Sequence, residues 1–261
     1  MDYAKEALRL HAKWNGKLET IPKMPIKTRD DLSIAYTPGV AAPCLEIKDD
    51  PKKSFTYTAR SHLVAVITDG SAVLGLGNIG AEASMPVMEG KCVLFKALGN
   101  VDAIPLALNT QDTDELVETI ARLEPSFGGI NLEDIAAPRC FEIERRLQER
   151  MNIPVFHDDQ HGTAVVVSAA VINAAKLTGR DLSRMKAIIN GAGAAGTAIA
   201  KMLMNLGIED VVACDSKGIL TRERNDLNEA KKRLAAVTNK NQIKGTLAEA
   251  VKGRDLFIGV S

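Results

Sequence analysis

The amino-acid sequence lacks most of the features that mark nucleic-acid-binding and membrane proteins. Its 33 basic and 33 acidic residues cancel, so charge gives no argument for nucleic acid or an anionic membrane surface as a partner. Aromatic residues make up only 4% of the 261 positions, which is few for a protein that stacks on bases or sugars. The uncharged runs 162–175 and 187–200 are too short to cross a bilayer. We therefore expect neither a nucleic acid nor a membrane as a partner.

Cysteines are few and widely spaced, which excludes two further classes of protein. The four thiols form no Cys-x-x-Cys pair, so neither a disulfide scaffold nor a zinc site is indicated. They are Cys44, Cys92, Cys140 and Cys214. Reduced thiols in a cytosol are the simplest interpretation. Charged residues between positions 2 and 9 stand where a signal peptide needs an apolar stretch, so we predict a cytoplasmic protein.

Apolar residues, by contrast, are plentiful enough for a packed core. They make up 46% of the chain, and its length predicts one large domain or two modest ones. In the first part, apolar runs predict strands that alternate with helices of amphipathic spacing. The predicted strands are 62–70, 103–108, 127–134 and 153–159, and the predicted helices are 2–13, 88–100, 111–125 and 137–151. The four prolines from Pro22 to Pro43 predict extended or turning chain without a helix.

The second part of the chain has a more regular alternation. Strands are predicted at 185–190, 210–215 and 255–261, and helices at 162–180, 197–207, 226–237 and 246–251. This order is typical of a parallel sheet with helices on both faces. We therefore predict an α/β protein with a mixed α/β domain at 1–160 and a Rossmann-like, doubly wound domain at 161–261. Because no helix follows the last strand, we expect this sheet to be incomplete in these 261 residues.

A glycine-rich turn between the strand at 185–190 and the next helix predicts a dinucleotide site. The first glycine allows a tight turn, the second lets the backbone approach a pyrophosphate, and the third lets helix and strand pack closely. The residues expected to bind are Gly191, Gly193, Ala194, Ala195 and Gly196. A tight turn without a nucleotide is the alternative.

Asp215, at the end of the next predicted strand, is the candidate residue for the ribose. Its carboxylate would accept hydrogen bonds from a 2′-hydroxyl and repel a 2′-phosphate, which favours NAD over NADP. Lys217 stands two residues further on and weakens this preference, so NADP stays open.

Carboxylates follow two of the predicted strands. Glu133 and Asp134 end one strand, and Asp158 and Asp159 end another. Carboxyl ends of strands face the crevice where ligands bind in α/β folds, and these oxygens suit Mg²⁺ or Mn²⁺. Helix capping by Asp134 and Asp159 is the alternative.

Four further side chains are candidates on weaker grounds. Tyr36 lies beside a Pro-Gly turn, although an ordinary half-buried tyrosine is the alternative. Lys91 follows Glu-Gly and could equally be a solvated lysine. His157 and His161 flank the carboxylates, but the second position of a zinc-binding HExxH motif is not Glu. We expect these histidines to pack or form hydrogen bonds.

Taken together, these segments resemble the malic enzymes from about Ser33 to Ser261. The segments AYTPGVA, VITDGSAVLGLGNIG, MEGK, NLED, FHDDQHGTA and INGAGAAG occur in the order that the family has them. FHDDQHGT is close to the signature of that family, and the short first domain looks like its compact bacterial form.

The resemblance implies an activity and assigns roles to particular residues. Malic enzymes oxidise (S)-malate with NAD or NADP and decarboxylate the oxaloacetate formed, giving pyruvate and CO₂. By position, Glu133, Asp134 and Asp159 match the three ligands of a divalent metal, Mg²⁺ or Mn²⁺. Tyr36 matches the acid that protonates the enolpyruvate carbon, and Lys91 the base that takes the hydroxyl proton, with Asp158 in the same network. A homodimer is the usual state of the family.

The sequence departs from the family at two points. Larger members have an arginine after the TDG turn, where this chain has Ser71 and Ala72, so we expect backbone groups of the loop 75–80 to help anchor malate. The family also continues beyond Ser261. Lys96 competes with Lys91 for the role of the base. A malolactic enzyme, which keeps its NADH and releases lactate, and a non-catalytic nucleotide- or metabolite-sensing module are the rival functions.

Overall fold

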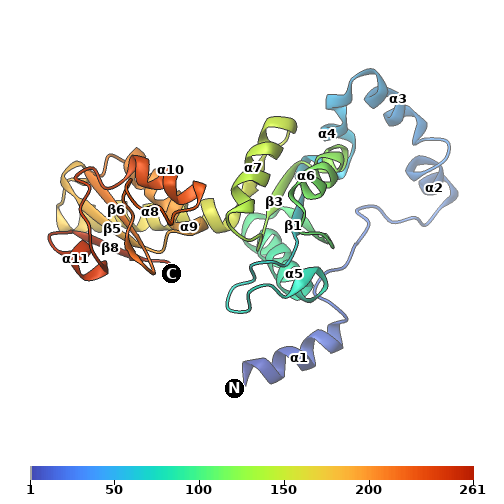
Figure 1. The fold of residues 1–261 in the computed structure, drawn as a ribbon. Helices are drawn as coiled ribbons and strands as arrows, with labels where there is room; N and C mark the ends of the chain where they lie inside the picture. Colours follow the sequence, from blue (N-terminus) through green and yellow to red (C-terminus); the bar gives the residue numbers. More distant parts are fainter. Residues whose placement is uncertain (1) are drawn as a thin grey trace. The chain divides into compact units, whose positions relative to one another are not determined.

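The computed structural model describes residues 2–261, which form two compact units (Figure 1). The first unit comprises the chain up to Asp134 together with Arg146–Val155, and the second comprises Ile135–Arg145 and Phe156–Ser261. The division passes through helix α7 (Arg139–Arg150) and strand β4 (Val155–His157). The boundary predicted at residues 160 and 161 stays a prediction.

A four-stranded sheet in the order β2-β1-β3-β4 organises the first unit. Strand β1 (Leu63–Thr68) pairs in parallel with β2 (Asp102–Ala107) and with β3 (Gly129–Leu132). The long helix α5 (Gly80–Gly99) packs on β1 and β2, and the amphipathic helix α6 (Thr113–Arg122) begins at an Asp112 cap. Side chains buried in the sheet and in these two helices form the core, among them Ile67, Met88, Leu116, Ile120 and Leu132.

The N-terminal segment contains helices where the prolines predict none. Helix α1 (Tyr3–Trp14) agrees with expectation, but α2 (Arg29–Ala35) and α3 (Ala41–Asp49) lie within or overlap the proline-rich stretch. The prediction was wrong because a capping box between Thr28 and Asp31 starts α2. Pro43 lies in the first turn of α3, where a missing N–H costs nothing. Short turns follow at η1 (Pro51–Lys53), α4 (Ser54–Tyr57) and η2 (Ala59–His62).

The second unit is built on a sheet in the order β7-β6-β5-β8. Strand β5 (Lys186–Asn190) pairs in parallel with β6 (Asp210–Asp215) and β8 (Leu256–Gly259), and the short β7 (Gly218–Ile219) is antiparallel. The helices of this unit are α8 (Asp158–Thr178), α9 (Ala194–Asn205), α10 (Glu229–Val237) and α11 (Leu247–Val251). Helix α8 packs against α9 over a core that includes Ile189, Ile199 and Leu203.

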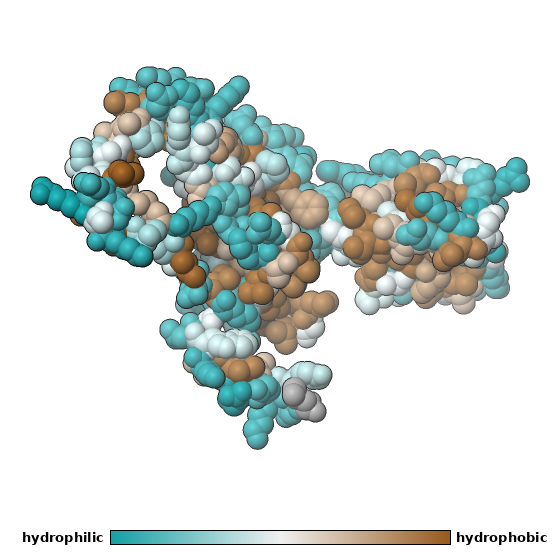
Figure 2. Space-filling model, turned by 180° about the vertical axis from the view of Figure 1, so that it is seen from behind, coloured by the Kyte–Doolittle hydropathy of each residue, from teal (hydrophilic) through white to brown (hydrophobic). Residues whose placement is uncertain are grey.

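Hydrophobic residues also reach the surface of both units (Figure 2). In the first unit, the exposed ones include Leu8, Trp14, Ile21, Ile26 and Ile34 of the N-terminal segment. None of the helices between residues 2 and 261 combines the length and apolarity that crossing a bilayer requires.

The core of the second unit makes a stability prediction with a matched control. Leu203→Ala on α9 removes a fully buried side chain and should lower the free energy of unfolding by about 2–5 kcal/mol. Leu177→Ala on α8 is the same substitution at a position that is 89% exposed. It should change the free energy of unfolding by less than about 0.5 kcal/mol. Urea denaturation followed by circular dichroism measures both, and equal effects would contradict the core assignment.

Candidate active site

Strand β3 ends in two buried carboxylates, Glu133 and Asp134, each 5% exposed. The ladder continues into Glu133, whose N–H donates to Ile67 O at 2.8 Å. The Glu133 carboxylate lies 3.1 Å from Lys91 Nζ on α5 and accepts a 2.8 Å hydrogen bond from Asn131 Nδ2. Lys91 is therefore a partly buried lysine beside an acid, with 23% of its side chain exposed, and not a solvated surface residue.

Lys96, the competing lysine, has a different environment. Its Nζ lies 2.6 Å from Asp102 Oδ1 in an ion pair at the surface, and 57% of its side chain is exposed. Of the two lysines on α5, only Lys91 points to the carboxylates that follow β3.

Asn131 is a site residue that our sequence reasoning missed. It lies two residues before Glu133 on the same face of β3, since side chains on a strand alternate with a period of two. Its amide holds Glu133 Oε2, so it fixes the direction in which the acid points. That period of two is the signal that could have identified it.

The loop after β1 is tied to the turn after β3. Asp134 has a left-handed φ of 53°, and its carbonyl accepts a 2.9 Å hydrogen bond from Ala72 N. Gly70 has φ of 66°, and a Cβ there would lie 2.1 Å from Gly80 O. Glycine is therefore needed for the TDG turn to close on the start of α5. Buried Asp69 accepts hydrogen bonds from the N–H and the hydroxyl of Ser71, which orders the residue after the TDG turn.

Asp158 and Asp159 lie in the first turn of α8, which begins four residues earlier than predicted. Acidic residues in a first turn are favoured by the helix dipole. The N-cap position of α8 is His157, so Asp159 does not act as the cap that the alternative interpretation required. A Cβ at Gly162 would lie 2.2 Å from Asp158 Oδ1, so a glycine is needed for this position of the Asp158 side chain.

A buried acid on α7 organises the residues around these two aspartates. Glu144 accepts hydrogen bonds from His157 N at 3.0 Å and Gln160 Nε2 at 3.1 Å, and lies 2.9 Å from His161 Nε2. The bond to Glu144 raises the pKa of His161. Burial lowers the pKa of His157, whose Nε2 lies 3.5 Å from Asp159 Oδ2. Both histidines thus pack or form hydrogen bonds, as expected, and Glu144 is a second residue that the sequence analysis missed.

The glycine turn excludes side chains at two of its glycines and leaves open space at the third. Gly191 has φ of 123°, and a Cβ on Gly196 would lie 1.7 Å from Gly191 O, so side chains are excluded at both positions. Gly193 is exposed with open space around it, and it caps α9 without a side-chain hydrogen bond. Ala194 and Ala195 open the helix behind it. The backbone at the start of α9 is therefore accessible to an anion.

Asp215 is held by cations at the end of β6. Its oxygens accept hydrogen bonds from Arg224 at 2.9 and 3.2 Å, from Lys231 Nζ at 2.7 Å and from Lys217 N at 3.0 Å. Burial raises the pKa of this carboxyl, but the hydrogen bonds from Arg224 and Lys231 outweigh it and lower the pKa to about 2.

Tyr36 is not brought to Lys91 within the first unit. It follows the last residue of α2, with 68% of its surface exposed, and so is not the half-buried tyrosine of the alternative interpretation. Helix α2 lies apart from α5 in Figure 1.

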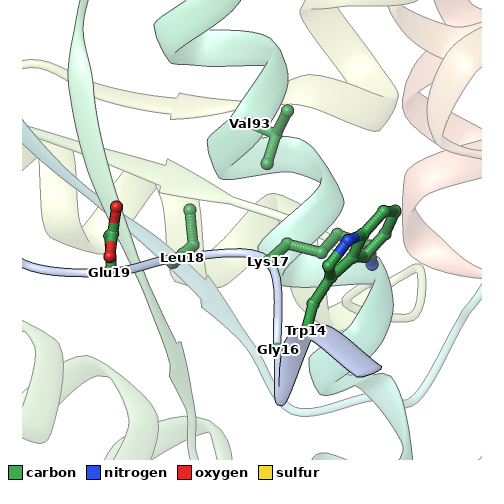
Figure 3. Close-up of a pocket in the computed structure, with 6 residues that line it drawn as sticks. All are labelled: Trp14, Gly16, Lys17, Leu18, Glu19 and Val93. Atoms are coloured by element: carbon green, nitrogen blue, oxygen red, sulfur yellow. The ribbon is translucent and has the colours of Figure 1, made fainter. Parts of the chain in front are cut away.

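A cavity of about 510 Å³ in the first unit lies between the segment after α1 and helix α5 (Figure 3). It is lined by Trp14, Gly16, Lys17, Leu18, Glu19 and Val93. None of the residues predicted to act in catalysis, nucleotide binding or metal binding lines it, so it is separate from the candidate site.

Comparison with known sequence families identifies the chain. The profile described as "Malic enzyme, N-terminal domain" matches residues 15–148, and that described as "Malic enzyme, NAD binding domain" matches residues 160–261. The chain belongs to the malic enzyme family. The resemblance inferred from the motifs is thereby confirmed.

Individual relatives agree with this assignment. The bifunctional malic/malolactic enzyme of Bacillus subtilis is 55% identical over 262 residues, which cover 100% of this chain and 64% of the relative. The NAD-dependent malic enzyme of Geobacillus stearothermophilus is 51% identical over 246 residues, covering 94% of this chain and 52% of the relative. This chain therefore spans between about half and two thirds of the length of these malic enzymes.

Solved malic enzyme structures confirm the predicted fold class. The NAD-dependent malic enzyme of Thermotoga maritima superposes with a TM-score of 0.93 at 51% identity, over 98% of this chain and 68% of that one. The malic enzyme of Pyrococcus horikoshii does so with a TM-score of 0.94 at 44% identity, over 99% of this chain and 62% of that one.

Proposed function

We propose that this chain carries the site of an enzyme that oxidises (S)-malate to pyruvate and CO₂ while reducing NAD or NADP, with the help of a divalent cation. The observation that carries the proposal is the contact of Lys91 with Glu133, which joins the MEGK and NLED segments next to Asp134. A glycine turn open to a dinucleotide supports it in the second unit.

The proposed ligands of the cation are Glu133, Asp134 and Asp159. The first two are buried at the end of β3, and the third lies in the first turn of the helix after β4, the neighbour of β3 in the sheet. Carboxylate oxygens fit Mg²⁺ or Mn²⁺. When bound, such an ion would withdraw electron density from the substrate oxygens during decarboxylation.

Lys91 and Tyr36 are the proposed base and acid, with Asp158 in the proton network of Lys91. In the oxidation, Lys91 would take the proton of the C2 hydroxyl, and a bound NAD or NADP would supply the acceptor for the hydride of C2. A lysine accepts a proton only as a neutral amine, a form that desolvation and a neighbouring cation favour. After CO₂ leaves, a phenol can return a proton to C3. Because Tyr36 is exposed, this role requires α2 to be held against a site.

A homodimer in the cytoplasm is part of the same proposal. The exposed apolar residues of the N-terminal segment, from Tyr3 to Tyr36, offer a surface that a second copy would cover. The unpaired state of the four cysteines supports a reducing compartment. Sedimentation equilibrium should give twice the chain mass of 28.0 kDa, and a monomer at all concentrations would contradict the dimer.

Malate oxidation with and without Mn²⁺, compared with NAD and NADP, tests the function. We expect pyruvate to form in step with the reduced nucleotide and only with the metal. The name of the Bacillus subtilis relative makes malolactic activity a second candidate, and lactate without net reduced nucleotide would favour it. Nucleotide binding without turnover would favour a sensing module.

Replacing the two lysines of α5 separates catalysis from surface charge. Lys91→Ala should lower kcat by about 10²–10⁴-fold, the usual contribution of a general base. Lys96→Ala removes the same charge from the same helix but only breaks a surface ion pair, so kcat should stay within about twofold. Steady-state kinetics measure both, and a similar loss in the two variants would refute the assignment.

The metal assignment makes an independent prediction. Asp159→Asn should abolish Mn²⁺-dependent turnover and weaken Mn²⁺ binding by about tenfold or more, because one anionic ligand is lost. Nucleotide binding should be unchanged, since Asp159 is not part of the glycine turn that begins at Gly191. Calorimetric titration with Mn²⁺ and with NAD measures the two affinities. Retained Mn²⁺ affinity in the variant would count against Asp159 as a ligand.

A further inference from the structure

The segment between α1 and α2 is attached to the rest of the first unit at its beginning. Residues 15–28 form no helix or strand, and all of them after Lys17 are exposed (Figure 1). Lys17 N donates to Glu89 Oε2 at 3.0 Å, and Lys17 Nζ donates to Pro86 O at 2.6 Å. This first attachment therefore joins the segment to α5 through a carboxylate and a carbonyl.

Further along the segment, a single lysine supplies the polar attachment. Across the residues that the structure describes, Lys23 is the only one between 18 and 26 that forms a hydrogen bond or ion pair. Its Nζ lies 2.9 Å from Nε2 of His62, the last residue of η2. Pro22 and Pro25 flank Lys23 and restrict the backbone on both sides of it. This one contact therefore holds a stretch that is otherwise open to solvent.

The imidazole of His62 can accept this hydrogen bond only while it is neutral. An ammonium group is a donor only, so Nε2 must present its lone pair to Lys23. The proton of the neutral ring is then on Nδ1, where Ser61 Oγ lies at 3.0 Å. Asp102 Oδ2 lies 3.2 Å from the same Nε2. A protonated ring has an N–H on both nitrogens, so its Nε2 would donate to Asp102 and could no longer accept from Lys23.

The charges that face His62 oppose each other. Lys23 approaches the ring from the segment, Asp102 from the first position of β2, and Lys96 from α5 through its contact with Asp102. The hydrogen bond from Lys96 lowers the pKa of Asp102, so this carboxylate is charged at neutral and mildly acidic pH. Arg60, also on η2, uses its guanidinium on other partners. A protonated imidazole is therefore attracted by Asp102 and repelled by Lys23.

We propose that Lys23 and His62 form a pH-dependent latch, which holds the segment between α1 and α2 on the first unit while the imidazole is neutral and releases it when the imidazole is protonated. Histidine is the side chain that gains its charge closest to neutral pH. Release frees the chain from Lys17 to α2, the helix that Tyr36 follows. The latch does not rest on the proposed function, although it sets the freedom of the helix that leads to the proposed acid.

The titration of the His62 ring tests the latch first. Lys23→Gln removes a cation that binds only the neutral ring, so the pH at which the ring is half protonated should rise by about 0.2–0.7 unit, the size expected of a surface contact. Lys27→Gln is the matched control. It removes the same charge from the same segment, and in the described chain the Lys27 side chain forms no hydrogen bond or ion pair.

Nuclear magnetic resonance of the imidazole C–H groups in the full chain measures the half-protonation pH, and His62→Gln identifies the signal. At physiological ionic strength, exposed charges that are not in contact are largely screened, so Lys27→Gln should shift it by no more than about 0.1 unit.

The backbone mobility of the segment tests the release itself. The heteronuclear Overhauser effect of the amides in 20–26 should fall between about pH 7.5 and about pH 5.5, whereas that of Lys17, whose acceptors include no imidazole, should not change. Lys23→Gln should make the segment mobile at both pH values. His62→Gln should keep it ordered at both, because an amide oxygen accepts from Lys23 at any pH.

Three results would overturn the latch: an unchanged half-protonation pH in Lys23→Gln, an equal shift in Lys27→Gln, or equal mobility of the segment at both pH values. None of them touches the proposed function, because the exchanged residues are not among its catalytic, metal or nucleotide residues. A failure of malate oxidation, in turn, leaves the latch standing.

Discussion

The burial of carboxylates where β3 ends is the constraint on which the rest of the first unit depends. Taking a charge out of water costs several kcal/mol unless partners compensate it. Glu133 obtains such partners from its own strand, through Asn131, and from helix α5, through Lys91. The packing of α5 on β1 and β2 is thus coupled to the chemistry, because the same helix that covers the sheet presents the candidate base.

In the second unit, the family signature contains both candidate functional residues and residues that hold them in place. In FHDDQHGT, Asp158 and Asp159 are the candidate functional groups, while His157, Gln160 and His161 direct hydrogen bonds to Glu144. These contacts attach the first turn of α8 to α7. They therefore fix the backbone from which the two aspartate side chains extend. Three residues of FHDDQHGT therefore support the helix turn that carries the two candidate acids.

The sequence predicts the elements whose periodicity or steric need is strong, and fails where tertiary contacts decide. Strand β6 and the glycine turn are as expected, because a β-branched run and the close approach of Gly191 to Gly196 leave little choice. Helix α5 begins well before its predicted start, since glycines and Pro86 disfavour helix in isolation. The capture of Asp215 could not be predicted, because Arg224 and Lys231 reach it from segments that only the fold brings together.

The central claim of this account is that Glu133, Asp134 and Asp159 bind one divalent cation. Crystals of the chain grown with Mn²⁺ would test it most directly, by an anomalous difference map recorded at the manganese edge. The account predicts one manganese peak per chain, within coordination distance of an oxygen from each of the three carboxylates. A peak that contacts only one or two of them, or a map without any peak near them, would contradict it.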